Sequence, residues 1–119
     1  MTYLTDSNII IYHLNGNQHA TDFLKNNSIA ISQITYLEVM SFSYSFDEAK
    51  IIRKLLNRFE LCDVTLAITE QAIENRLRKK IKVPDNIIAA TAIVYDYSLA
   101  THNTKDFKGL DVKLFDPIS

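Results

Sequence analysis

Four acidic residues are placed where short apolar runs give way to helices or loops. They are Asp6, Glu38, Asp85 and Asp106. The carboxyl ends of parallel strands share one edge of a sheet, so we expect the four carboxylates to converge there. Like charges repel by about 3 kcal/mol per pair at roughly 5 Å and an effective dielectric constant near 20. A divalent cation bound between them would relieve this repulsion.

Each carboxylate also has a purely structural interpretation. Asp6 and Asp85 suit the start of a helix, where an acidic side chain caps the backbone and complements the helix dipole. The segment from Thr35 to Glu38 has the spacing of a capping box, which places Glu38 in the first turn of a helix. Asp106 could close a turn with its own backbone. Four such residues at one edge nevertheless favour a metal site over four unrelated caps and turns.

The type of ligand indicates the type of metal and of reaction. Hard oxygen ligands without paired histidines or thiolates select Mg²⁺ or Mn²⁺ over zinc. Because Mg²⁺ keeps bound waters that can attack phosphorus, the set predicts phosphodiester hydrolysis. Histidines offer an alternative, a metal-independent acid and base that cleave RNA through the 2′-hydroxyl. The candidates are His13, His19 and His102, and nothing in the sequence pairs two of them.

Alternating strand and helix patterns predict the elements that position these residues. Strands are expected at residues 3–5, 29–32, 61–64, 99–101 and 112–115. Helices are expected at residues 9–14, 20–25, from about 35, 47–59, 69–80 and 85–97, with a polar loop at 102–111. This alternation predicts an α/β fold whose parallel sheet is covered by helices on both faces.

The composition fits one soluble domain. The chain has 119 residues, 47% of them hydrophobic, with 2 Gly and 2 Pro, so we expect a single domain over residues 1–119 without linkers or repeats. Its one cysteine, Cys62, excludes an internal disulfide framework and a cysteine zinc site, and its apolar neighbours predict a buried thiol. No apolar run approaches the roughly 20 residues that span a membrane, so we expect a cytoplasmic protein without membrane contact.

A basic segment precedes Asp85. The net charge of −1 argues mildly against a body that binds nucleic acid as a whole. Residues 76–82 nevertheless carry five cations in seven positions: Arg76, Arg78, Lys79, Lys80 and Lys82. Contact with phosphates and a solvated helix end are equally good interpretations of this segment. His102 is one further candidate for contact with a substrate.

Four segments, around Asp6, Glu38, Asp85 and Asp106, resemble the signature of PIN-domain nucleases, most closely that of the small VapC-like toxins of bacterial and archaeal toxin–antitoxin pairs. The specific parts are Asp6-Ser7-Asn8, the helix start at Pro84-Asp85, and Thr101-His102-Asn103-Thr104-Lys105-Asp106-Phe107, in that order and at domain-length spacing, whereas the glutamate segment alone is a weak signal. The resemblance covers nearly the entire chain. It implies a three-layer α/β/α domain with a five-stranded, mainly parallel sheet.

The resemblance also implies a site, an activity and partners. The residues implied to hold Mg²⁺ or Mn²⁺, directly or through water, are Asp6, Glu38, Asp85 and Asp106. Those implied to support the site are Asn8, Thr101 and Asn103. The implied activity is that of an endoribonuclease that cleaves RNA with a metal-activated water. Homodimerisation and a cognate antitoxin that blocks the site are implied too, and the apolar stripe on residues 47–59 suits a core, a dimer contact or an antitoxin groove.

Two departures from the family pattern and two other classes of protein bear on this interpretation. His102 stands where relatives often carry arginine, and Tyr97-Ser98 replaces the glycine that frequently ends the central helix. A left-handed residue there would cost about 1 kcal/mol without glycine. A phosphoacceptor receiver module is disfavoured because Cys62-Asp63 is expected inside the third strand. A catalytically inert PIN-like binding module is disfavoured because all four acidic residues are present.

Overall fold

A sheet of five parallel strands forms the centre of the computed structural model, which describes residues 1–119. The strands are β1 (Thr2–Thr5), β2 (Ser28–Ser32), β3 (Glu60–Cys62), β4 (Ser98–Ala100) and β5 (Leu114–Phe115). Their order across the sheet is β3-β2-β1-β4-β5, and every neighbouring pair is parallel. The predicted five-stranded α/β fold is therefore confirmed, with a sheet that is parallel throughout.

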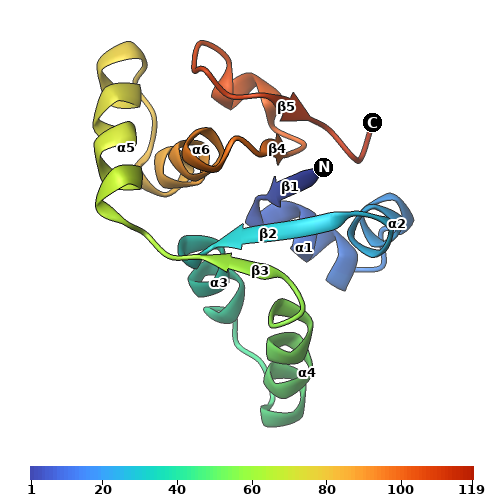
Figure 1. Ribbon diagram of the computed structural model, residues 1–119. Coiled ribbons are helices and arrows are strands. Elements are labelled where there is room, and N and C mark those ends of the chain that lie inside the picture. The colour runs from blue at the N-terminus through green and yellow to red at the C-terminus, as the bar shows by residue number, and fades with distance from the viewer.

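Helices cover both faces of the sheet and complete the three layers (Figure 1). One face carries α1 (Ser7–Leu14), α2 (Gln18–Asn26), α3 (Gln33–Met40) and α4 (Phe46–Leu56), and the other carries α5 (Leu66–Arg78) and α6 (Val83–Tyr95). A short 3₁₀ helix, η1 (Thr104–Phe107), follows β4. The longest helices, α5 and α6, have 13 residues each, and no helix is both long enough and apolar enough to cross a membrane.

Alternating side chains of the strands feed two separate cores. In β2, Ile29 and Ile31 pack with α1 to α4, whereas Ala30 faces the opposite layer. In β1, Leu4 faces the layer of α6 and is fully buried. Burial of an isoleucine or leucine side chain stabilises the fold by about 1.5–3 kcal/mol. Because both faces are apolar, the sheet is fixed as a middle layer, and polar chemistry is left to its edges.

Side-chain caps set the start of most helices. Five of the six α-helices begin after a residue whose side chain accepts a backbone N–H: Asp6, Asn17, Ser32, Ser45 and Thr65. Ser45 and Glu48 form a reciprocal capping box at the start of α4. The helix α6 has no side-chain cap, and Pro84 in its first turn defines its start instead.

The start of α3 differs from the prediction. The helix begins at Gln33, because the Ser32 hydroxyl accepts the backbone N–H of Ile34 at 3.1 Å. Thr35 therefore lies inside the helix, fully buried, and its hydroxyl forms no hydrogen bond. The predicted capping box between Thr35 and Glu38 is wrong, and Glu38 lies in the second turn of α3 rather than in the first.

The end of α6 and the end of β3 differ as well. The left-handed residue after α6 is Asp96 (φ 55°, ψ 40°), not Tyr97 or Ser98. Aspartate tolerates this conformation better than most residues do, which explains how the helix stops without glycine. The strand β3 ends at Cys62, which is buried as predicted, so Asp63 follows the strand rather than lying inside it. The predicted position of Asp63 inside the third strand, which counted against a receiver module, is therefore wrong. The observed strand order, 3-2-1-4-5, nevertheless differs from the 2-1-3-4-5 order of receiver modules.

Other boundaries were shorter than predicted. The helix α4 ends at Leu56, where 59 was expected, and β5 contains only Leu114 and Phe115. Ile51, part of the predicted apolar stripe, is 68% exposed, whereas Ile52 and Leu56 are buried in the core. The segment after β4 was predicted to be a polar loop, and it contains the short helix η1, whose Phe107 is buried.

Candidate active site

The strand order reverses between β1 and β4, which makes the carboxyl ends of these two strands the expected position of a ligand site. From β1 the chain runs to β2 and β3 on one side of the sheet, and it returns with β4 on the other side of β1. Such a switch in direction opens a crevice at the carboxyl ends of the two central strands. The backbone N–H of Asp6 donates to the carbonyl of Ala100 at 3.1 Å, which holds the ends of β1 and β4 together. Asp6 and Thr101 directly follow these two strands.

Asp6 is a buried carboxylate with several donors around it. It is 7% exposed, and its Oδ1 accepts the backbone N–H of Ile9 at 3.2 Å, so it is the cap of α1 as well as a site candidate. Burial raises the pKa of Asp6 to about 6, and the nearby charge of Asp85 adds to the rise. Hydrogen bonds from the Thr101 side chain and from the backbone of Ile9 and Asn8 act in the opposite direction.

Asp85 is the carboxylate that connects the others. It lies in the first turn of α6 and is half-buried. Its pKa is raised, first by burial and then by the negative charges of Glu38 and Asp106, while the Lys82 ammonium lowers it. Since Asp85 also raises the pKa of Asp6, its charge interacts with all three other acidic residues. The fold thus brings four carboxylates from four separate segments to one edge of the sheet.

Glu38 is held by a residue that the sequence did not single out. The Ser7 hydroxyl donates to Glu38 Oε1 at 2.6 Å and ties the first residue of α1 to the second turn of α3. Ser7 belongs to the Asp6-Ser7-Asn8 segment, but its partner lies 31 residues away and cannot be identified from spacing. We regard Ser7 as the residue that orients the Glu38 carboxylate.

The resemblance of the sequence implies RNA cleavage, and on that expectation Ser7→Ala should lower kcat about 5- to 10-fold, because the Glu38 carboxylate loses a hydrogen bond worth about 1–1.5 kcal/mol. Cleavage kinetics in saturating Mn²⁺ would test this. Ser41→Ala is the matched control, since the Ser41 hydroxyl donates to the Leu37 carbonyl at 2.6 Å on the same helix without touching a carboxylate. Equal activity of both variants would show that Ser7 does not orient Glu38.

The segment after β4 supports the site through its backbone and one hydroxyl. The backbone N–H of Asn103 donates to Thr101 Oγ1 at 3.1 Å, and the N–H of Asp106 donates to the Asn103 carbonyl at 3.1 Å. Asp106 is exposed within η1. Asn8 is exposed too and contributes its N–H to Asp6. Thr101 is thus the one predicted supporting residue whose side chain affects a carboxylate of the site, since its hydroxyl lowers the pKa of Asp6.

The donor set suits a hard divalent cation, although the carboxylates stand apart. All candidate ligands are oxygens, and burial and mutual repulsion raise the pKa of Asp6 and of Asp85. No group of three or more His, Cys, Asp or Glu side chains lies close enough to share one ion as placed. Side-chain rotations within the crevice would be needed to close a ligand shell around Mg²⁺ or Mn²⁺.

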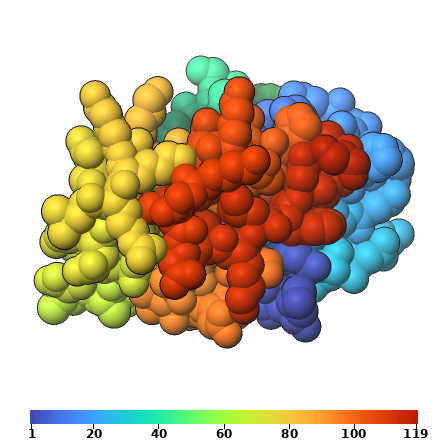
Figure 2. Space-filling model, turned by 90° about the horizontal axis from the view of Figure 1, so that it is seen from above, coloured from blue at the N-terminus to red at the C-terminus, as the bar shows by residue number.

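Lysines line a hollow beside two of the carboxylates. It has a volume of about 340 Å³ and is lined by Lys79, Lys80, Ile81, Lys82, Asp85, Lys105 and Asp106. Figure 2 shows the segments that form it, where the yellow residues near 80 lie beside the orange-red residues that follow 100. Of the five predicted cations, Arg76 and Arg78 do not line it. They lie in the last turn of α5, where cations also complement the helix dipole.

His102 is paired with an acid. Its Nδ1 lies 2.9 Å from Asp116 Oδ2, and its ring packs edge-on against Tyr12 at a centroid distance of 6.0 Å. His13 instead binds the Thr21 hydroxyl at 2.7 Å. His13 and His102 thus have separate hydrogen-bond partners, and neither is hydrogen-bonded to a second histidine.

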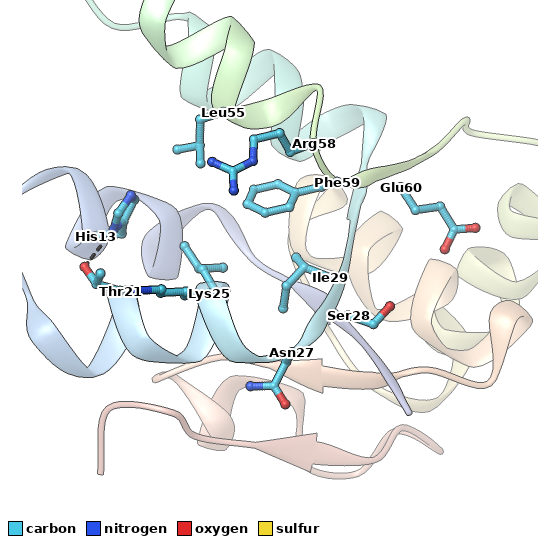
Figure 3. A pocket seen from close by; sticks show the side chains of 11 residues that line it. His13, Thr21, Lys25, Asn27, Ser28, Ile29, Leu55, Arg58, Phe59 and Glu60 are labelled. Atoms are coloured by element: carbon cyan, nitrogen blue, oxygen red, sulfur yellow. Dashed lines mark hydrogen bonds between the residues drawn. The ribbon is translucent and has the colours of Figure 1, made fainter.

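A larger hollow lies away from the carboxylates. It measures about 590 Å³ and opens at the opposite edge of the sheet, where β2 and β3 begin (Figure 3). Its basic residues His13, Lys25 and Arg58 lie in or just after the last turns of α1, α2 and α4, where cations complement helix dipoles. Glu60 is turned away and accepts the Tyr97 hydroxyl at 2.6 Å. The converging carboxylates therefore define the candidate site, despite the smaller hollow.

Comparison with known proteins agrees with this geometry. The family model described as "PIN domain" matches residues 3–113. The chain is 33% identical over 113 residues to Ribonuclease VapC10 of Mycobacterium tuberculosis, covering 87% of this chain and 84% of that protein. A structure titled as a toxin–antitoxin complex from Klebsiella pneumoniae is 34% identical and aligns with a TM-score of 0.87 over 97% of each chain.

A second solved structure, titled VapBC2 from Rickettsia felis bound to a DNA fragment from its promoter, is 28% identical with a TM-score of 0.83 over 98% of each chain. The fold, the order of the acidic segments and these similarities agree along almost the whole sequence. The chain belongs to the PIN domain family.

Proposed function

We propose that this protein is a divalent-metal-dependent endoribonuclease and the toxin of a toxin–antitoxin pair. It acts in the cytoplasm, where its RNA substrate is present. The observation that carries the proposal is the coupling of Asp85 to the charges of Asp6, Glu38 and Asp106 at the carboxyl edge of the sheet. Relatives named ribonuclease VapC, from two organisms, support the activity. Solved relatives titled as toxin–antitoxin complexes support the biological role.

The residues divide the chemistry between them. Asp6, Glu38, Asp85 and Asp106 would hold Mg²⁺ or Mn²⁺, which when bound would supply a water of lowered pKa and neutralise charge that develops on the phosphate. Thr101 fixes Asp6, and Ser7 fixes Glu38. Lys80 and Lys82 lie beside Asp85 in the 340 Å³ hollow and attract the phosphates of RNA. The scissile phosphate is thereby drawn to the carboxylate edge.

A cognate antitoxin and a second copy of the chain are the proposed protein partners. Large apolar side chains remain exposed along α5, where Leu66 is 74%, Ile73 52% and Leu77 80% exposed. Such recurring exposed residues on one helix are typical of surfaces that another protein covers. The titles of the relatives' complexes favour an antitoxin among these partners.

We expect EDTA to abolish cleavage of total RNA, and Mn²⁺ or Mg²⁺ to restore it, because four carboxylates without a cation repel both phosphate and one another. Gel analysis of purified protein incubated with total RNA would measure this. His102→Ala is the control and should retain activity, since His102 binds Asp116 rather than a carboxylate of the site. Cleavage that persists in chelator would contradict the proposal and favour a histidine mechanism.

A further inference from the structure

Lys79 differs from the other lysines of the hollow in what its ammonium group touches. Its Nζ donates to the backbone carbonyl of Lys108 at 2.8 Å and to that of Lys105 at 3.4 Å. These two carbonyls flank Asp106 in the chain. The ammonium group therefore bridges both ends of the turn that presents this carboxylate.

The other end of Lys79 is fixed as firmly. It is the residue after α5, and its backbone N–H donates to the Asn75 carbonyl at 3.0 Å. The Asn75 side chain is buried and donates to the Asn86 side chain at 3.0 Å, and Asn86 in turn donates to the Ala72 carbonyl at 2.8 Å. Asn86 directly follows Asp85 in α6. Lys79 is thus anchored to the same pair of helices that carries Asp85.

Apart from hydrogen bonds within its own segment, the turn that carries Asp106 is joined to α5 and α6 by the hydrogen bonds of Lys79 alone. The helix η1 has four residues and no side-chain cap, and Asp106 is exposed. Buried Phe107 anchors the turn in the core, whereas the Asp106 side chain that precedes it is exposed. Backbone carbonyls bound to a charged donor contribute more than neutral hydrogen bonds do.

The charge of Lys79 is not directed at the carboxylates. The ammonium group that lowers the pKa of Asp85 is that of Lys82. Two of the three protons on Lys79 Nζ are already donated to carbonyls, which leaves little for a phosphate. Lys79 therefore affects the site by holding the backbone of η1 and the residue after it, not by direct contact with a carboxylate.

We propose that Lys79 is a positioning residue that sets the distance between Asp106 and Asp85, and that Lys80 rather than Lys79 meets the RNA backbone. For RNA cleavage this rests on the proposed function. Lys79 links the α5–α6 pair to the turn after β4, two segments 26 to 29 residues apart that share no other side-chain hydrogen bond. Its loss leaves Asp85 in place and lets Asp106 move.

The test compares Lys79→Met with Lys80→Met, which remove the same charge from adjacent positions of the same hollow. In chelator, hydrogen exchange of the amides of residues 103–110 should become about 10-fold faster in Lys79→Met and stay unchanged in Lys80→Met. Mn²⁺ affinity, measured by calorimetry, should fall about 10-fold in Lys79→Met alone. Lys79→Arg should keep both the amide exchange of residues 103–110 and the Mn²⁺ affinity at wild-type values, because a guanidinium group can also donate to two carbonyls.

Cleavage kinetics give an independent readout. Lys79→Met should lower kcat at unchanged KM. Lys80→Met should raise KM at unchanged kcat, and its KM should depend less on salt concentration than that of the wild type. The inference is overturned if Lys79→Met leaves exchange of residues 103–110 unchanged or raises KM as Lys80→Met does. Absence of RNA cleavage by the wild-type protein would instead count against the proposed function, while the exchange measurement would still decide the role of Lys79.

Discussion

Replacement of Asp85 by Asn is expected to lower RNA cleavage about 1000-fold. Asp85 is the carboxylate whose charge interacts with Asp6, Glu38 and Asp106, so its loss removes the centre of the proposed metal site rather than one peripheral ligand. Loss of a single electrostatic or acid–base group in an active site costs about 10²–10⁴ in rate. Single-turnover cleavage of a fixed RNA in saturating Mn²⁺ would measure the loss.

Two controls separate this effect from misfolding. In chelator, Asp85→Asn should be more stable than the wild type by about 1 kcal/mol, since repulsion is relieved but solvent screens a half-exposed group. Asp63→Asn removes an exposed acid just after β3 at the same edge and should leave cleavage unchanged. A lower melting temperature of Asp85→Asn without metal would argue against convergence of the four charges.

Asp6 should make the metal-free protein less stable as pH rises. Its pKa is about 6 in the folded chain against an ordinary value of 3.8, so the folded state binds more protons between these values. The free energy of unfolding therefore falls as pH rises from about 4 to about 6, by roughly 3 kcal/mol at 1.36 kcal/mol per pKa unit. Asp6→Asn should lack this loss and still cap α1 through its amide oxygen.

Denaturant unfolding in chelator between pH 4 and pH 7.5 would measure this difference. Asp111→Asn, the loss of an exposed acid far along the chain, should follow the wild-type curve. Above pH 6, Mn²⁺ should stabilise the wild type and not Asp6→Asn, because a cation binds the ionised carboxylate. Parallel curves for the wild type and Asp6→Asn across the range would show that the Asp6 carboxyl does not have a raised pKa in the folded chain.

Hydrophobic periodicity predicted the kind and order of the elements because burial on both faces of a parallel sheet leaves a strong local pattern. Predictions from local sequence were wrong where two neighbouring residues could both cap the same helix. Serine and threonine are both favourable N-cap residues. Ser32 is the residue that caps α3, whereas Thr35 lies inside the helix and is buried in the core. The left-handed residue that ends α6 was also not predicted, because glycine is the usual residue at such a position and Asp96 occupies it here.

The candidate site could be predicted in part. The acidic residues stood out because each follows an apolar run, a feature of local sequence. The roles of Ser7 and Lys79 depend on partners 26 to 31 residues away, so spacing gave no sign of them. Lys79 in particular was one of five similar cations, and only the approach of the turn after β4 sets it apart from Lys80.

The position of β1 in the middle of the sheet has a consequence for synthesis on the ribosome. During synthesis β1 can pair with β2 early, but its other neighbour, β4, comes from residues 98–100, much later in the sequence. Contacts over so long a separation form slowly. The middle strand of the sheet therefore stays half-paired until β4 has emerged, and the carboxylates that follow these strands meet only then.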